Sequence, residues 1–259
     1  MAGSYAIATG TAQLVPDRDS DRRWTLNVNG VPSSWIDLDD PADLGFEYLD
    51  TMRTILDDHL PPPHRVDAVH LGGAGCTFAR ALAAARPRSR QVVAEIDPDL
   101  VELARISFGL SAVPGLRLRA VDGLSLLAAT RDSSADLVVR DAFAGEAVPG
   151  ELTTAGFLAE VTRVLAPDGL YLANVADRPP LRLARAEVAT ALCAFAQVAL
   201  VAEPGVLRGR RYANLVLAAS AGTLPLDRWG RSVRGGAVPM RLVAGDDLTA
   251  FAAASTPIR

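Results

Sequence analysis

The sequence predicts an α/β protein built on one mostly parallel sheet, and three observations lead to this prediction. After residue 64, short apolar segments alternate with segments of helical periodicity, as in strands joined by helical crossovers. Near the C-terminus two apolar segments follow each other without a helix between them, which indicates an antiparallel edge. Before residue 44, alternating apolar and polar residues predict a small β-rich unit. Together they predict a Rossmann-like sheet with an N-terminal β-hairpin unit.

The first 59 residues are predicted to form strands followed by one helix. Residues 5–15 and 24–38 alternate as strands do, with a polar turn over residues 17–21 between them. The pair Asn29-Gly30 indicates a hairpin turn inside the second segment. Helical periodicity then covers residues 44–59, and three consecutive prolines end that helix.

The α/β part follows the prolines. Strands are predicted at residues 66–71, 91–96, 116–121, 135–140 and 170–175. Helices are predicted between them, at residues 78–86, 98–108, 123–129 and 153–165. A further helix at about 181–197 precedes two late strands, 198–203 and 213–219, an ending that is typical of the methyltransferase-type Rossmann fold. We therefore expect a β-hairpin unit at 1–43, a nucleoside-binding domain at 44–220, and a C-terminal extension at 221–259 with one short helix at 246–254.

Composition excludes several classes of function. The net charge is -4, which disfavours a nucleic-acid partner. The chain has no lysine, so a Schiff-base or P-loop lysine is excluded. Its three histidines and two cysteines lack metal-ligand spacing, and we expect no metal. Residues 1–20 lack the pattern of a secretory signal and no apolar run is long enough to cross a bilayer, so we expect a cytoplasmic protein without membrane contact.

A glycine turn follows the first strand of the α/β part. The segment Leu71-Gly72-Gly73-Ala74-Gly75 joins this strand to a helix, so backbone can approach a nucleoside there. Glu95 ends the second strand, where a carboxylate can bind ribose hydroxyls. Asp122-Gly123 follows the third strand and can meet an adenine edge. Both acids could instead cap the helices that follow them. Because they lie at the ends of successive strands, ligand binding is the favoured interpretation. The pattern does not distinguish NAD from an S-adenosyl compound as the ligand.

Polar residues also follow the fourth and fifth strands. Asp141 ends the fourth strand, and this order fits an S-adenosyl fold better than a dehydrogenase. Its carboxylate is the candidate catalytic group, able to accept a proton from an amine nucleophile or to orient it; the alternative is a helix cap. Asn174 and Asp177 follow the fifth strand and are candidates for binding substrate, or are ordinary loop residues.

At this point the chain resembles the spermidine synthase family, in particular divergent bacterial members of it. The likeness covers roughly residues 30–220. The segments that carry it are 34–38, Phe46-Glu47-Tyr48, Leu71 to Gly75, Glu95-Ile96-Asp97, Asp122-Gly123, and Asp141-Ala142-Phe143 with Pro149 and Leu152. They resemble the family's entry hairpin and first helix, its glycine motif, its ribose-binding and adenine-binding acids, and its gate loop. The resemblance implies that Tyr48 lines the acceptor pocket.

The chain departs from the family at the sites that recognise amines. The family's glycine motif carries an aspartate that holds the amine of the aminopropyl donor, and Gly75 stands there. Its gate loop carries a second aspartate, where this chain has Ala144. Leu49 replaces a polar neighbour of Tyr48. The adenosine half is therefore retained and the polyamine-recognition acids are partly lost.

Three functions remain open at this stage. The first is a spermidine synthase-like transferase whose donor is S-adenosylmethionine or its decarboxylated form. The second is a methyltransferase that uses S-adenosylmethionine and a small-molecule acceptor. The third is a non-catalytic protein that binds the nucleoside. In each case the partner is a small molecule, and the resemblance is compatible with a homodimer.

Overall fold

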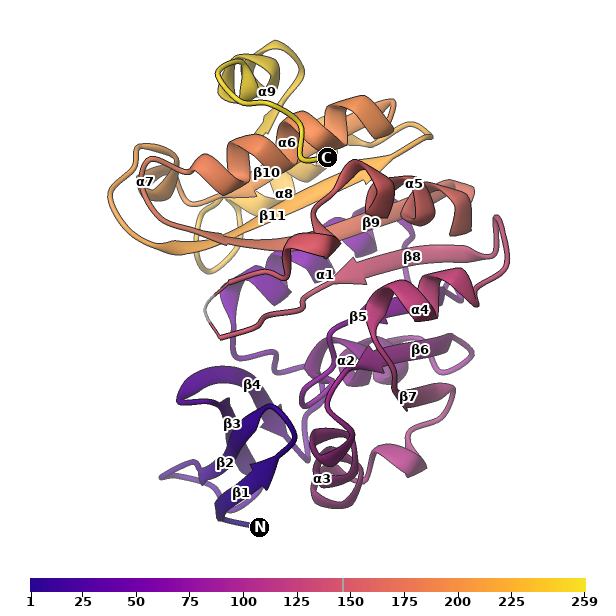
Figure 1. Cartoon of the computed structure of the whole chain (residues 1–259), viewed down its shortest axis with the longest axis vertical. Coiled ribbons are helices and arrows are strands. Elements are labelled where there is room, and N and C mark those ends of the chain that lie inside the picture. Colours follow the sequence, from indigo (N-terminus) through magenta and orange to yellow (C-terminus); the bar gives the residue numbers. More distant parts are fainter. Residues whose placement is uncertain (146) are drawn as a thin grey trace.

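The computed structural model describes residues 1–145 and 147–259. Its strands form two sheets, a four-stranded sheet at the N-terminus and an eight-stranded central sheet (Figure 1). The small sheet lies at one end of the molecule, beside α2 and α3, and the C-terminal elements lie at the other end (Figure 1). The predicted α/β class with a small N-terminal β-rich unit is confirmed.

The N-terminal sheet is an antiparallel meander in the order β1-β2-β3-β4. Its strands are β1 (Gly3–Ile7), β2 (Gly10–Pro16), β3 (Arg23–Val28) and β4 (Val31–Asp37). The predicted turn at Asn29-Gly30 joins β3 to β4, with φ of 51° and 80° at the two residues. The continuous strand predicted over 5–15 is wrong, because the chain turns at Ala8-Thr9. Gly10 permits this turn, since a Cβ there would lie 2.0 Å from Oδ1 of Asn29.

The central sheet has the strand order β12-β10-β11-β9-β8-β5-β6-β7. Its strands are β5 (Asp67–Leu71), β6 (Arg90–Glu95), β7 (Leu116–Ala120), β8 (Ala135–Arg140), β9 (Leu165–Asp177), β10 (Gln197–Ala202), β11 (Ala213–Ser220) and β12 (Arg241–Ala244). Strands β5 to β9 pair in parallel, whereas β11 is antiparallel to both β9 and β10. The chain order reverses between β5 and β8, where open α/β sheets bind ligands beyond the carboxyl ends of the strands.

Helices cover both faces of this sheet. They are α1 (Glu47–His59), α2 (Thr77–Ala85), α3 (Pro98–Phe108), α4 (Gly123–Ala128), α5 (Ala155–Val164), α6 (Arg182–Ala194), α7 (Pro204–Leu207), α8 (Leu226–Arg234) and α9 (Gly245–Ala252). Apolar side chains of α1, α2 and α8 pack on one face, and those of α4, α5, α6 and α9 pack on the other. A third cluster joins the N-terminal sheet to α2, α3, β6 and β7.

The C-terminal segment adds two elements that the sequence analysis missed. Helix α8 packs Trp229 and Val233 against the α1 face, and β12 extends the sheet by pairing with β10. The three predicted segment boundaries, 1–43, 44–220 and 221–259, stay predictions. Within the described parts of the chain, no helix is long and apolar enough to cross a membrane.

Candidate active site

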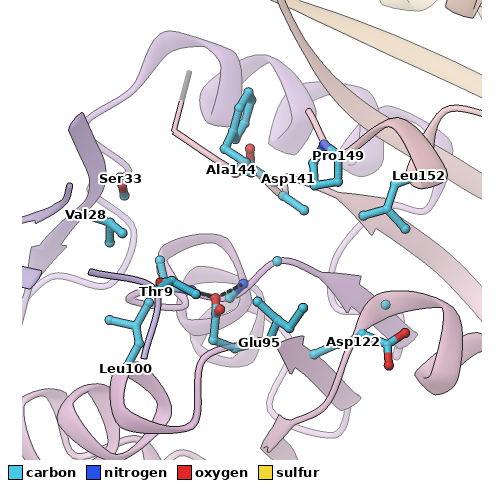
Figure 2. A pocket seen from close by; sticks show the side chains of 18 of the residues that line it. Thr9, Val28, Ser33, Glu95, Leu100, Asp122, Asp141, Ala144, Pro149 and Leu152 are labelled. Carbon is cyan, nitrogen blue, oxygen red and sulfur yellow. Dashed lines mark hydrogen bonds between the residues drawn. The ribbon is translucent and has the colours of Figure 1, made fainter. Parts of the chain in front are cut away.

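A cavity of about 730 Å³ opens at the carboxyl ends of β5, β6, β7 and β8. The predicted residues Gly72, Gly73, Ala74, Glu95, Asp122, Gly123 and Asp141 all line it. Figure 2 shows Glu95 and Leu100 on one side of the cavity, with Asp141, Ala144 and Pro149 across from them. This volume is in the range of ordinary small-molecule sites.

The glycine turn brings the ends of β5 and β8 together. Gly72 has a φ of +93°, and a Cβ there would lie 2.3 Å from the carbonyl oxygen of Asp141. Only glycine permits this approach, because a side chain would collide with backbone. The backbone N–H of Asp141 donates to the carbonyl of Leu71 at 2.9 Å, which fixes the start of the loop after β8.

Glu95 holds the glycine turn from the end of β6. Its Oε2 accepts the N–H of Gly73 at 3.2 Å and that of Ala74 at 3.0 Å (Figure 2). Its Oε1 accepts the N–H of Asp97 at 3.1 Å. The carboxylate therefore lies on the cavity wall in a fixed orientation, where it can also accept hydrogen bonds from a ligand's hydroxyl groups.

Asp122 both caps a helix and lines the cavity. Its Oδ1 accepts the N–H of Ser125 at 2.8 Å, so it is the N-cap of α4. Hydrogen bonds from Ser125 lower the pKa of Asp122, which keeps the carboxylate ionised. Helix capping and ligand contact, which the sequence analysis treated as alternatives, are compatible at this residue.

Asp141 is the centre of a polar cluster drawn from three elements. Its Oδ2 accepts the hydroxyl of Tyr48 on α1 at 2.9 Å, and its Oδ1 accepts the side-chain amide of Asn174 on β9 at 2.9 Å. Burial raises the pKa of Asp141, although both hydrogen bonds and the nearby Arg140 oppose the shift. Burial, with the charge of Asp141, raises the pKa of Tyr48 well above its usual value, so the phenol remains a donor. The described helices that directly follow β8 have Pro149 and Thr154 at their N-caps, so Asp141 is not the N-cap of either.

Four predicted residues do not line this cavity. Tyr48 and Asn174 lie behind its wall, where both bond to Asp141. Gly75 and Asp177 make other contacts. Gly75 donates its N–H to Oγ of Ser34 at 2.9 Å and packs against the N-terminal sheet. Asp177 accepts the N–H of Ala184 at 2.9 Å and so caps the first turn of α6. Asn174 and Asp177 are three positions apart on β9, so their side chains point to opposite faces of the sheet.

The N-terminal sheet supplies a wall of the cavity that the sequence analysis missed. Thr9, Val28, Asn29 and Ser33 all line it, and three of them are labelled in Figure 2. The turn before β2 is attached to Asp97, the N-cap of α3. The Asp97 carboxylate accepts the N–H and the hydroxyl of Thr9, at 2.6 and 2.7 Å. The exposed Ile96 and Leu124 line the cavity as well.

Among the residues that the structure describes, no group of acidic, histidine or cysteine side chains could hold a metal ion. Cys76 is buried and Cys193 is exposed, and both are free thiols.

Known aminopropyltransferases and spermidine synthases are similar to this chain in sequence or in structure. A polyamine aminopropyltransferase from Chromobacterium violaceum is 30% identical over 161 residues, 62% of this chain and 60% of the relative, so the match spans less than two thirds of that protein. A probable spermidine synthase of known structure from Corynebacterium glutamicum is 33% identical, with a TM-score of 0.90 over 99% of this chain and 95% of that chain. A spermidine synthase in complex with the transition-state analogue AdoDATO is 14% identical, with a TM-score of 0.66 over 90% of this chain and 78% of that chain. No family model matches the chain.

The strand order and the cavity at the switch point define the class, a protein of methyltransferase-type Rossmann fold. Within that class, the near full-length likeness to the Corynebacterium protein shows that the chain belongs to the spermidine synthase family. The resemblance inferred from the motifs is confirmed.

Proposed function

We propose that this chain is a spermidine synthase-like transferase that binds decarboxylated S-adenosylmethionine in the large cavity. The observation that carries the proposal is that the backbone N–H groups of the glycine turn are all used within the protein. Every backbone N–H from Gly72 to Cys76 donates within the protein: to the carbonyl of Ala94, twice to Glu95, to Ser34 Oγ, and to the carbonyl of Gly73. The turn offers no free N–H to a ligand carboxylate.

The charges around the cavity favour the same donor. Four carboxylates line it, those of Glu95, Asp122, Asp141 and Glu151, and none of the described lining residues is arginine or histidine. A sulfonium and an ammonium are attracted to such a wall. The carboxylate of intact S-adenosylmethionine would be desolvated near like charges without an N–H of the glycine turn to bind it, which is unfavourable. Methyl transfer from S-adenosylmethionine is therefore the less favoured alternative.

The proposed chemistry at the acceptor is proton removal by Asp141. Burial raises the pKa of this carboxyl, which makes it a stronger base than an exposed aspartate. Tyr48 and Asn174 hold its two oxygens and so orient the lone pairs that remain. An amine acceptor that loses its proton there can attack the propyl carbon bonded to the donor sulfur. The new C–N bond replaces the C–S bond, and 5′-methylthioadenosine leaves with the sulfur electron pair. We propose that the acceptor is a small molecule with one amine near Asp141.

Binding of the nucleoside is tested with the variant Glu95→Ala. We expect 5′-methylthioadenosine to bind the unmodified chain and to lose about 1.5–3 kcal/mol in the variant, because a charge-assisted hydrogen bond to ribose is removed. The glycine turn also loses the acceptor of two of its N–H groups in this variant. Calorimetry measures both affinities. The matched control is Glu102→Ala on α3, an exposed acid in the same region, which should leave the affinity unchanged. Equal affinities in the unmodified chain and Glu95→Ala would remove Glu95 from the site.

Donor selectivity separates the alternatives. Decarboxylated S-adenosylmethionine should bind more tightly than S-adenosylmethionine if the proposal holds. A preference for the carboxylate-bearing form would support methyl transfer instead. Binding without turnover of any acceptor would support a non-catalytic protein, and binding of NAD without any adenosyl-sulfur compound would overturn the class of ligand.

Putrescine should be a poor acceptor. A diamine needs a counter-charge at both ends, and the second gate-loop acid of the family is replaced by Ala144, whose backbone pairs with Ala147. We expect aminopropyl transfer to putrescine to be slow or absent with the decarboxylated donor. Turnover on the order of 1 per second would show that Ala144 and Gly75 do not exclude diamines.

Two further expectations rest on sequence and family alone. We propose a cytoplasmic location, and we propose that the chain forms a homodimer, which the family resemblance implies. Light scattering on the purified chain would measure the second.

A further inference from the structure

A second, small cavity adjoins the large one on the α1 side of the sheet. Its volume is about 40 Å³, enough for a group of the size of a water molecule or an ammonium. The two cavities share Ser33, the turn residues from Gly72 to Ala74, and Asp141. The small cavity is lined in addition by Tyr48, His70 and Thr77. In the proposed function, the donor tail would reach the small cavity past these shared residues.

The side chain of His70 has a defined tautomer in this cavity. The amide of Gln91 donates from Nε2 to the carbonyl of Ala79 at 2.9 Å, so its Oε1 is an acceptor. That oxygen lies 2.9 Å from Nε2 of His70, which must carry the ring proton. Nδ1 is then a hydrogen-bond acceptor, and none of the described residues occupies it. His70 is 3% exposed, and burial lowers its pKa to about 4, so the ring is neutral.

The space next to Gly75, where the resemblance implies an aspartate that holds the donor amine, is filled in this chain. A Cβ at Gly75 would lie 2.8 Å from Cδ1 of Ile36 and 2.9 Å from Cβ of Ser34. Strand β4 thus fills the space in which an aspartate side chain would begin. If the donor carries a primary amine, another part of the chain must bind it.

We propose that His70 is a specificity residue that accepts a hydrogen bond from the primary ammonium of the donor tail in the small cavity. This inference rests on the proposed function. An ammonium has three N–H donors. Three side chains that line the small cavity can each supply an acceptor: His70 through Nδ1, Asp141 through a carboxylate oxygen, and Ser33 through its hydroxyl oxygen. The Ser33 hydroxyl donates its own proton to the carbonyl of Val31. Asp141 also supplies the opposite charge, which the neutral imidazole does not.

The test compares two nucleosides that differ in the amine. One is 5′-methylthioadenosine, and the other is the same nucleoside with a 3-aminopropylthio tail. Calorimetry gives the ratio of their dissociation constants for the unmodified chain and for His70→Phe. We expect the unmodified chain to favour the amine-bearing nucleoside, and His70→Phe to reduce that preference about 10- to 100-fold with little change for methylthioadenosine. His70→Asn, which retains an acceptor close to the Nδ1 position, should restore part of the preference.

The outcomes separate this inference from the proposed function. If neither nucleoside binds the unmodified chain, the proposed function fails, and the inference fails with it. If both bind and His70→Phe leaves their ratio unchanged, or His70→Asn loses as much of it as His70→Phe, the inference alone is overturned. If His70→Phe does not fold, the double variant His70→Phe with Gln91→Leu gives the same comparison, because it leaves no unpaired Gln91 oxygen.

Discussion

Replacement of Asp141 by asparagine should lower turnover about a hundredfold to ten-thousandfold, which is the usual loss when a positioned general base is removed. The side chain keeps its shape and can still bond to Tyr48 or to Asn174, whose contacts with Asp141 are both 2.9 Å. The variant removes the charge and the basicity. Melting temperature and methylthioadenosine affinity should therefore stay near those of the unmodified chain, and all three quantities can be measured on one preparation.

The pH dependence adds a second readout for Asp141. Burial raises the pKa of this carboxyl, and a base must be deprotonated to act. Turnover should therefore fall as the pH drops through this raised pKa, at a higher pH than an ordinary aspartate would give. Tyr48→Phe removes one hydrogen bond from the carboxylate and should give a smaller loss of rate. If Asp141→Asn melts early and its activity only follows the folded fraction, Asp141 has a structural role.

Among the proposed single variants, Glu187→Ala should lower the free energy of unfolding the most. Arg140 and Glu187 form an ion pair at 2.7 Å, with side chains 0% and 4% exposed. Among the described residues, the carbonyls of Leu152 and Asn174 would remain as hydrogen-bond partners of the buried guanidinium, and no carboxylate would be bonded to it. Loss of one partner of a buried pair costs about 3–5 kcal/mol. Each kcal/mol lowers the melting temperature of a chain of this size by roughly 2–4 °C.

An exposed pair serves as the control for Glu187. Glu160 pairs with Arg163 on α5 at 2.8 Å, and its side chain is 40% exposed. Glu160→Ala should cost about 0–1 kcal/mol, because water screens such pairs. Urea unfolding of both variants measures the difference. If the two variants are equally stable, the buried pair has no special role. Arg140 also holds the carbonyl of Asn174, so Glu187→Ala should slow the reaction as well.

Much of the fold could be predicted because its signals are local. The alternation of apolar strands with amphipathic helices predicted the strands from β5 to β11 and the longer helices between them. The prediction that no helix separates the last two of these strands is wrong, because the four-residue helix α7 lies between β10 and β11. Strand β12 was missed because a four-residue strand at a sheet edge depends on its pairing with β10, which no local pattern reports. Helix α8 carries a signal that was available, since Trp229 and Val233 are four positions apart and both are buried.

The site residues that follow strands could be predicted from the local sequence, whereas those that depend on packing between distant segments could not. Glu95, Asp122 and Asp141 follow successive strands, so the topology of a parallel sheet brings them to one edge. The contacts of Thr9 and Ser33 depend on how the N-terminal sheet packs, which the sequence does not state. His70 was considered only as a metal ligand. The alternation of side chains along β5 could have placed it on the face opposite to Leu71.

The attachment of Thr9 to Asp97 has a consequence for how binding and folding are linked. Thr9 and Ser33 complete the cavity only while the N-terminal sheet is docked, and Asp97 holds that sheet through the same segment that carries Glu95. A nucleoside that contacts both parts must therefore favour the docked arrangement, and undocking must weaken its affinity by the same factor. Docking of the N-terminal sheet and binding of the nucleoside are thus thermodynamically linked. Amide exchange in β1 and β2 should slow when a nucleoside binds, although both strands lie outside the Rossmann core.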